Sequence, residues 1–189
     1  DLLPRQPVTL DNFGIENLVR DKIVLVTGAG GSIGSEICRQ ILSKKPKQLL
    51  ALGHGEMSIY SLMESLIQAG NKIPVKPLIA DVADTAMMEN IYREYRPQLV
   101  FHAGAHKHVP LMEENPQEAL RVNSFGTWNI ASLAGKFGVE RMVMISTDKA
   151  VNPTSVMGAT KRIAEKLIFY VQKEYPDTKY MAVRFGNVL

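Results

Sequence analysis

Short apolar runs alternate with amphipathic stretches along most of the chain. The apolar runs are rich in Val, Ile and Leu and have the length of strands that are buried on both faces of a sheet. The stretches between them repeat apolar residues at helical spacing. The expected strands are 22–27, 47–52, 74–80, 98–103, 140–146 and 179–185. The expected helices are 33–44, 56–69, 84–95, 116–137 and 159–175.

Strands that alternate with helices of this length predict a parallel sheet with right-handed crossovers. We therefore expect an α/β fold, a Rossmann-like doubly wound parallel sheet flanked by helices, with ligands at the carboxyl ends of its strands. Residues 1–21 lie outside the repeat, and their prolines and scattered apolar residues predict an extended arm followed by a short helix capped near Asp11. Residues 22–189 form the expected dinucleotide-binding domain.

Composition narrows the function classes. The chain has 189 residues, enough for one domain with a substantial core. A formal charge of +3 without an aromatic-interleaved basic patch gives no reason to expect a nucleic acid partner. The single cysteine excludes an internal disulfide and a cysteine-based zinc site. Because no apolar run approaches the roughly 20 residues of a membrane span, and no signal peptide is recognisable, we expect a cytoplasmic location.

A glycine-rich turn follows the first strand and predicts a dinucleotide site. After Thr27, glycines recur every third residue at 28, 31 and 34, and the next helix begins at Ser32 and Ile33. The unpaired N–H groups and the dipole of a helix N-terminus attract a phosphate, and side chains on Gly28, Gly31 or Gly34 would hold a pyrophosphate away. This T-G-x-x-G-x-x-G form resembles the short-chain dehydrogenase/reductase superfamily.

The end of the second strand bears on the choice of cofactor. An NAD site normally has an acidic residue here to hold the ribose hydroxyls. The position is occupied by Gly53, and the following His54 can approach a 2′-phosphate, so the sequence favours NADP over NAD. Glu56 lies close enough to serve a ribose, which leaves NAD as an alternative, and His54 is equally compatible with an idle loop.

The third and fourth strands supply further cofactor candidates. Asp81, followed by Val82, can accept a hydrogen bond from an adenine amino group, although Asp is also a common helix N-cap. Small residues after the fourth strand let the backbone approach a cofactor closely; they are Ala103, Gly104 and Ala105. Histidines 102, 106 and 108 follow without a clear carboxylate or cysteine partner, so we predict no metal there. His106 or Lys107 is a better candidate for a sugar or phosphate contact.

Four segments in order make a family resemblance specific: TGAGGSIGSE, FHAGAHKHVPLME, STDKAVNP and MGATK. Together they resemble the nucleotide-sugar 4,6-dehydratases of bacterial capsule, exopolysaccharide and glycan biosynthesis, which are extended short-chain dehydrogenases. The resemblance is to the UDP-N-acetylglucosamine 4,6-dehydratase type and to its long membrane-associated members. It implies an NAD(P) cofactor and a UDP-sugar substrate.

The same resemblance has implications for the rest of the protein. It implies a C-terminal substrate lobe that is largely absent from this chain, so that the chain binds cofactor but turnover needs the lobe. It also implies a membrane tether through an N-terminal part that is absent here. Helices 116–137 and 159–175 are dimerisation surfaces by analogy, which predicts a homo-oligomer.

The reaction implied by the resemblance transfers hydride from sugar C4, eliminates water across C5 and C6, and returns the hydride to C6. By match to the family motif, Asp148 is the acid, Lys149 the base, and Thr147 hydrogen-bonds the C4 oxygen. Asp148 starting as a carboxylate would first collect the C4 hydroxyl proton. In extended backbone these neighbours point to opposite sides and need not pair. The alternative is that Asp148 caps a turn and Lys149 is solvated.

Further residues are assigned from the same resemblance. Lys107, His108 and Asn187 are expected substrate contacts, and Asn123 is expected mainly to pack. The superfamily's Tyr-x-x-x-Lys pair keeps Lys161, but Met157 stands in place of the tyrosine. A thioether cannot exchange a proton, which argues against ordinary reductase chemistry. It also argues against the first alternative function, an NAD(P)-dependent nucleotide-sugar epimerase. The second alternative is a non-catalytic cofactor-binding module.

Overall fold

The apolar runs form six parallel strands within residues 11–186, the part of the chain that the computed structural model describes. The strands are β1 (Ile23–Thr27), β2 (Gln48–Gly53), β3 (Val75–Ile79), β4 (Leu99–His102), β5 (Arg141–Thr147) and β6 (Lys179–Phe185). Their order in the sheet is β3-β2-β1-β4-β5-β6, and each neighbouring pair is parallel. This is the strand order of a doubly wound dinucleotide-binding sheet, so the predicted fold class is confirmed.

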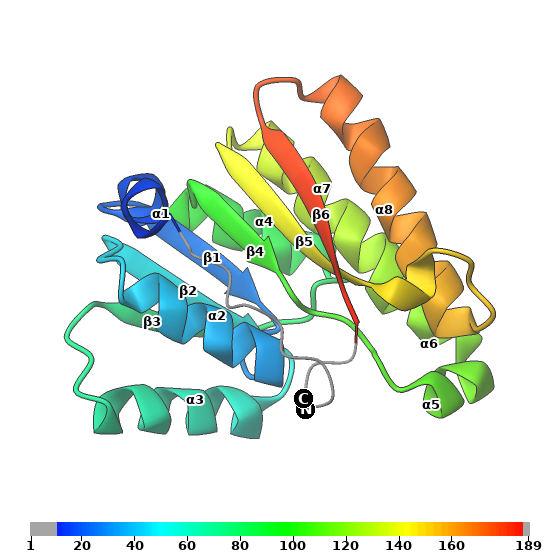
Figure 1. Ribbon diagram of the computed structural model, residues 1–189, viewed down its shortest axis with the longest axis horizontal. Helices are drawn as coiled ribbons and strands as arrows, with labels where there is room; N and C mark the ends of the chain where they lie inside the picture. The colour runs from blue at the N-terminus through cyan, green and yellow to red at the C-terminus, as the bar shows by residue number, and fades with distance from the viewer. Residues whose placement is uncertain (1–10, 187–189) are drawn as a thin grey trace.

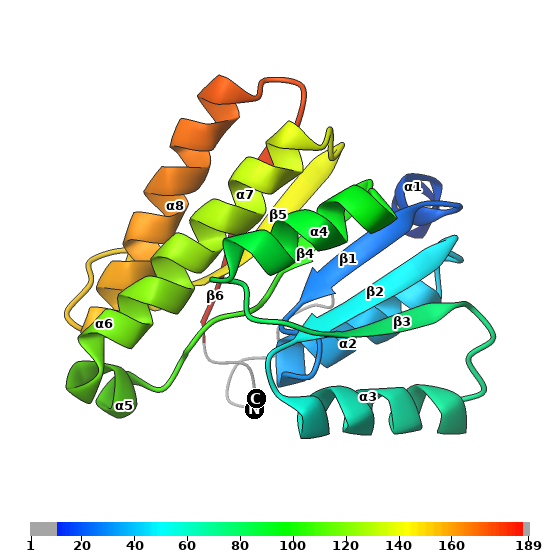
Figure 2. The ribbon, with the colours of Figure 1, turned by 180° about the vertical axis from the view of Figure 1, so that it is seen from behind.

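Helices cover both faces of the sheet (Figure 1). One face carries α2 (Ser32–Leu42) and α3 (Glu56–Gln68). The opposite face, seen from behind in Figure 2, carries α4 (Thr85–Tyr95), α7 (Thr127–Lys136) and α8 (Val156–Glu174). A short α1 (Asn12–Val19) precedes β1 and is capped by the Asp11 side chain, as predicted. Among residues 11–186, no helix is both long and apolar enough to cross a membrane.

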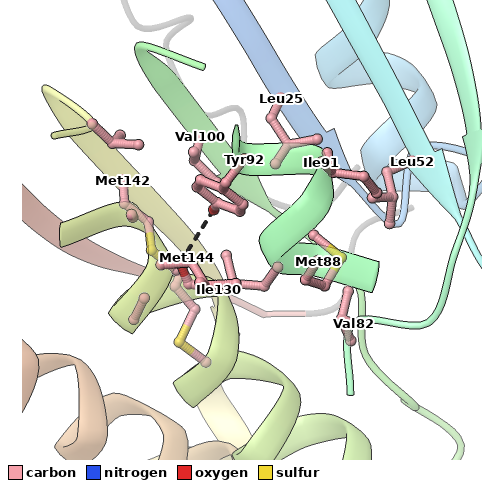
Figure 3. Close-up of a cluster of buried hydrophobic side chains, with 14 of the residues drawn as sticks. Leu25, Leu52, Val82, Met88, Ile91, Tyr92, Val100, Ile130, Met142 and Met144 are labelled. Atoms are coloured by element: carbon pink, nitrogen blue, oxygen red, sulfur yellow. Dashed lines mark hydrogen bonds between the residues drawn. The ribbon is translucent and has the colours of Figure 1, made fainter. Parts of the chain in front are cut away.

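Consecutive residues of the central strand β1 are buried on opposite faces, as the pleat requires. Leu25 belongs to the apolar cluster under α4, α7 and α8, whereas Val24 belongs to the cluster under α2 and α3. Figure 3 shows the first cluster, in which Tyr92 of α4 lies fully buried and donates its hydroxyl proton to the Ile130 carbonyl at 3.2 Å. The two apolar layers hold the sheet rigid and so fix the strand ends that carry the site.

Three helix predictions need correction. The predicted helix 116–137 is divided into α6 (Pro116–Ala119), a π-helical turn η1 (Leu120–Gly126) and α7. The loop after β4 contains an unpredicted helix, α5 (Val109–Glu114), whose first turn includes Pro110, a residue with the backbone angle that a helix start needs. The last helix, α8, begins at Val156 rather than at 159, because the Ser155 side chain caps it by accepting from the Gly158 N–H.

Candidate functional site

The glycine turn after β1 brings the backbone close to two other segments. Gly28 has φ +65° and lies so near the loop after β4 that a Cβ there would be 2.6 Å from the Gly104 nitrogen. A Cβ on Gly34 would overlap the Gly28 carbonyl oxygen. The turn is closed by the Gly31 N–H, which donates to the Gly28 carbonyl at 3.0 Å. Gly31 then serves as the N-cap of α2 without a side-chain cap, so the first N–H groups of α2, which begins at Ser32 and Ile33, face outward.

A cavity of about 260 Å³ opens at the carboxyl ends of the first four strands. Its lining includes Gly28, His54, Asp81, Gly104 and Arg121. It also includes several candidates from the sequence, namely Gly31, Val82, Ala103, Ala105 and His106. Glycines and other small residues from the loops after four strands therefore lie together in one site, as the strand order predicts. Glu56 lies further along, in the first turn of α3.

Arg121 of η1 organises the charges at this cavity and was not identified from the sequence. Its guanidinium donates to Asp81 Oδ2 at 2.8 Å and to both oxygens of Glu118 at 2.8 and 2.9 Å. Asp81 also accepts from the Ala83 N–H at 2.9 Å. Partial burial raises the pKa of Asp81, but the Ala83 N–H and Arg121 outweigh it and hold that pKa below its usual value. The helix N-cap predicted as an alternative for Asp81 is supplied instead by Asp84.

His102 is a buried structural histidine at the end of β4. Its Nδ1 lies 2.7 Å from Thr27 Oγ1 and its Nε2 lies 3.0 Å from Thr127 Oγ1. The Thr127 hydroxyl donates its proton to the Asn123 carbonyl at 2.7 Å, so it accepts from Nε2–H, and Nδ1 accepts from Thr27. Burial and the positive charge of Lys161 lower the pKa of His102 to about 3, which keeps the ring neutral.

The catalytic candidates after β5 lie in a single 3₁₀ turn, η2 (Asp148–Ala150). Thr147 Oγ1 donates to Asp148 Oδ1 at 3.0 Å, and Lys149 Nζ donates to the same oxygen at 3.3 Å. The expectation that Asp148 and Lys149 point apart is therefore wrong, because the turn replaces extended backbone. The Thr147 hydroxyl and then the Lys149 ammonium lower the pKa of Asp148. Asp148 and Lys149 are exposed, and Thr147, the last residue of β5, is half-buried beside them.

Met157 and Lys161, one helical turn apart at the start of α8, are both buried but have different surroundings. Met157 is 4% exposed and packs in an apolar cluster with Met112 and Ala119. Lys161 is 5% exposed, and its Nζ donates to the Ile145 carbonyl of β5 at 2.7 Å. Burial lowers the pKa of Lys161 to about 8. The sequence did not reveal that a glycine is needed at position 158, where a Cβ would be 2.5 Å from the Lys149 carbonyl oxygen.

The loop between β4 and α5 is held by Asn123, which is more than a packing residue. Its fully buried amide accepts from the His106 N–H at 2.8 Å and donates to the His106 carbonyl at 3.0 Å. The loop carries Lys107 and His108, the expected substrate contacts, which are exposed. The third expected contact, Asn187, lies outside the described residues. Within residues 11–186, no three His, Cys, Asp or Glu side chains are grouped so that they could hold a metal.

These features fit a bound dinucleotide. The close approach at Gly28 and the uncapped start of α2 leave room and N–H donors for a pyrophosphate. The remaining cavity lies at the point where the strand order reverses between β1 and β4, the usual place of such a ligand in an open sheet.

The chain is similar to curated proteins of polysaccharide biosynthesis. It is 55% identical to the probable polysaccharide biosynthesis protein EpsC of Bacillus subtilis over all of this chain and 32% of that protein. It is 32% identical to a UDP-N-acetylglucosamine 4,6-dehydratase (inverting) of Campylobacter jejuni over 89% of this chain and 49% of the other. The chain thus spans 32% of the first of these relatives and about half of the second.

Solved structures give the same fold. The X-ray structure of Pen from Bacillus thuringiensis matches with a TM-score of 0.83 and 34% identity, over 90% of this chain and 51% of that one. A UDP-glucose 4-epimerase of Bifidobacterium longum in complex with NAD+ and UDP matches with a TM-score of 0.74 over 86% of this chain and 52% of that one. At 20% identity, the latter match shows the fold alone.

The family model described as polysaccharide biosynthesis protein matches residues 24–189, from the second residue of β1 to the last residue of the chain. That span contains the glycine turn, the cavity, the turn after β5 and Lys161. The chain therefore belongs to this family of polysaccharide biosynthesis proteins.

Proposed function

We propose that the protein is a nucleotide-sugar 4,6-dehydratase that converts UDP-N-acetylglucosamine to a UDP-4-keto-6-deoxy sugar in polysaccharide biosynthesis. The observation that carries the proposal is the cluster of Thr147, at the end of β5, with Asp148 and Lys149 of the exposed turn η2, beside the start of α8 and at the same edge of the sheet as the cavity. The Campylobacter jejuni relative of that name supports the substrate class.

Residues of four loops would hold the cofactor. The α2 N-terminus after Gly31 suits the pyrophosphate, and Asp81 suits the adenine amino group, since each carboxylate oxygen can accept a second hydrogen bond. When bound, NAD(P) supplies the hydride acceptor for C4 and the hydride donor for C6. The prediction of NADP over NAD rests on Gly53 and His54. Titration with both cofactors tests it, and tighter binding of NAD would contradict it.

Asp148 transfers one proton twice in this proposal, first as a base and then as an acid. Its lowered pKa keeps it a carboxylate at neutral pH, so it accepts the C4 hydroxyl proton while C4 is oxidised. The ketone at C4 acidifies the C5 proton. Once substrate has displaced Lys149 from Asp148 and the ammonium has lost a proton to solvent, the neutral Lys149 amine removes the C5 proton as the C5–C6 double bond forms, and it returns that proton to C5 when hydride reaches C6. Asp148 then returns its proton to the departing C6 hydroxyl, which leaves as water. Substrate must separate the two side chains first, because Lys149 Nζ lies 3.3 Å from Asp148 Oδ1.

Met157 supports a dehydratase over an epimerase. An epimerase needs a proton-exchanging group where this chain places a buried thioether. Lys161 is held near the carboxyl end of β5 by its hydrogen bond to the Ile145 carbonyl. From there it would contact the nicotinamide ribose. Membrane tethering and a homo-oligomer remain predictions from the resemblance.

The test gives the full-length protein UDP-N-acetylglucosamine that carries deuterium at C4, and follows the product by NMR without added reduced cofactor. Deuterium at C6 of a 4-keto-6-deoxy product is the expected result, and Asp148→Asn should reduce its formation strongly. A C4 epimer would replace this proposal by the epimerase. Cofactor binding without any turnover would favour the non-catalytic module.

A further inference from the structure

Two side chains one helical turn apart on α8 bond to consecutive residues at the end of β5. Lys161 Nζ donates to the Ile145 carbonyl at 2.7 Å, and Glu165 Oε1 accepts from the Ser146 hydroxyl at 2.7 Å. Residues four apart on a helix share one face, so the two bonds act side by side. They fasten α8 to the strand segment that leads directly into Thr147 and the catalytic turn.

Glu165 is a buried carboxylate with an unusually complete set of partners. It is 2% exposed. Arg184 of β6 donates to both of its oxygens, at 2.8 and 2.7 Å, and Arg162 donates to one at 3.2 Å. The Arg184 guanidinium and the Ser146 hydroxyl outweigh burial and lower the pKa of Glu165 to about 2, so it is ionised at neutral pH. The carboxylate thus joins α8, β5 and β6 at one point.

The surroundings of Lys161 make this carboxylate electrostatically important. Burial lowers the pKa of Lys161, whereas the negative charge of Glu165 raises it. His102 of β4 is neutral, because its own pKa lies at about 3, and offers no compensating charge. The groups that bond to or act electrostatically on Lys161 or Glu165 include His102 of β4, Arg162 of α8 and Arg184 of β6. The elements packed against α8 also carry the charged side chains of Glu113 and Glu114 of α5, Glu118 of α6, Arg121 of η1, Lys136 of α7, Arg141 of β5, Asp148 and Lys149 of η2, and Lys179 of β6.

We propose that Glu165 is a positioning residue, which fixes the carboxyl end of β5 against α8 and β6 and keeps the neighbouring Lys161 in its ammonium form. The inference rests on the proposed function, because it gives Glu165 a part in holding groups that the reaction uses. It adds a residue that touches neither cofactor nor substrate in that reaction. An ammonium at position 161 would favour an anionic dinucleotide, and a neutral amine would not.

The direct test is the titration of Lys161 by NMR in protein carrying ¹³C-labelled lysine, with Lys161→Arg to assign the signal. In Glu165→Gln the Lys161 pKa should fall below its value of about 8, by on the order of one pH unit. Glu89→Gln is the matched control, since it removes a half-buried carboxylate of α4 that pairs with Lys136 of α7 rather than with a residue of α8, β5 or β6. An unchanged Lys161 titration in Glu165→Gln would overturn the proposal.

A double variant guards against loss of the fold. Glu165→Met with Arg184→Leu replaces the ion pair between the buried Glu165 and the more exposed Arg184 by apolar side chains, so that no buried charge is left without its partner. The Lys161 pKa should again fall. Ser146→Ala removes one bond but keeps the charge, so it should leave the Lys161 pKa near the wild-type value and lower kcat with little change in KM. A fall in the Lys161 pKa of Ser146→Ala as large as that in Glu165→Gln would contradict the assigned role of the charge.

A second readout connects Glu165 to the cofactor. Dinucleotide affinity should decrease as pH rises through the Lys161 pKa, and in Glu165→Gln the decrease should begin at lower pH. Because the NMR titration does not depend on turnover, the two proposals can fail separately. A shifted Lys161 pKa without any dehydratase product would refute the proposed function only. A dehydratase product with an unshifted Lys161 pKa would refute only the role of Glu165.

Discussion

The neutral, buried His102 predicts a specific loss of stability in mild acid. Its pKa is about 3 in the folded chain and 6.5 in the unfolded chain. Between these values the unfolded chain binds a proton that the folded chain does not, so acidification through pH 6.5 favours unfolding. The slope approaches about 1.4 kcal/mol per pH unit, and between pH 7 and pH 5 the loss amounts to about 2 kcal/mol.

The substitution His102→Gln isolates the part of the acid-induced loss of stability that comes from His102. The amide keeps one donor and one acceptor for the two threonine hydroxyls but has no titration in this range. The variant should start less stable at pH 7, yet lose about 2 kcal/mol less than wild type on going to pH 5. The carboxylates with lowered pKa values, such as Glu165 with a pKa of about 2, titrate below pH 5. They therefore contribute equally to the change in stability of the variant and of wild type.

The assay is urea unfolding of both proteins at pH 7 and pH 5, compared as the difference in the free energy of unfolding. His54→Gln is the matched control, because it removes an exposed histidine and should leave the wild-type acid loss intact. The reasoning would be refuted if His102→Gln lost as much stability in acid as wild type. It would also be refuted if His54→Gln abolished the loss.

Two further predictions concern a turn and a helix start. Gly28→Ala should abolish dinucleotide binding, because its Cβ would meet a backbone amide of the β4 loop at 2.6 Å. Gly70→Ala is the control, because Gly70 has φ +71° but lies in open space, so its substitution should lower stability without affecting binding. Calorimetric titration measures the affinity of both variants, and an equal loss of affinity in the two would contradict the reasoning. Glu113→Ala should destabilise the protein by about 1 kcal/mol, since the Glu113 carboxylate accepts from the Val156 N–H at 2.7 Å at the start of α8. Thermal unfolding measures the loss, and an equal loss in the neighbouring Glu114→Ala would argue against a specific cap.

The strands and the glycine turn were predictable because their signals are local. The run before Gly28 is apolar at consecutive positions, and few sequences other than glycine-rich ones form a tight turn between such a strand and a helix. The order of the elements then placed the carboxyl ends of β1 to β4 together. The close approach of Gly28 to the β4 loop follows from that order, although no pattern near either segment encodes it.

The charged contacts around the site were not predictable, because they join residues remote in sequence. Arg121 meets Asp81 across 40 residues, and nothing in the local pattern of η1 marks its guanidinium. Arg184 meets Glu165 across 19 residues, and its strand reads only as an apolar run with a charge near each end. The pairing of Asp148 with Lys149 was missed for a different reason, since it depends on a 3₁₀ turn where strand geometry was assumed.

The sheet order has a consequence for how the protein is made. Of the six strands, β1 leaves the ribosome before the others but lies in the middle of the sheet, between β2 on one side and β4 on the other. During synthesis, β1, β2 and β3 can pair early, yet one edge of β1 stays open until β4 emerges. The lining of the cavity is incomplete until the segment that carries Gly104 and Arg121 has been synthesised. A cofactor therefore cannot assist the first half of folding, and the exposed edge of β1 is the point at which a nascent chain most needs protection from wrong pairing.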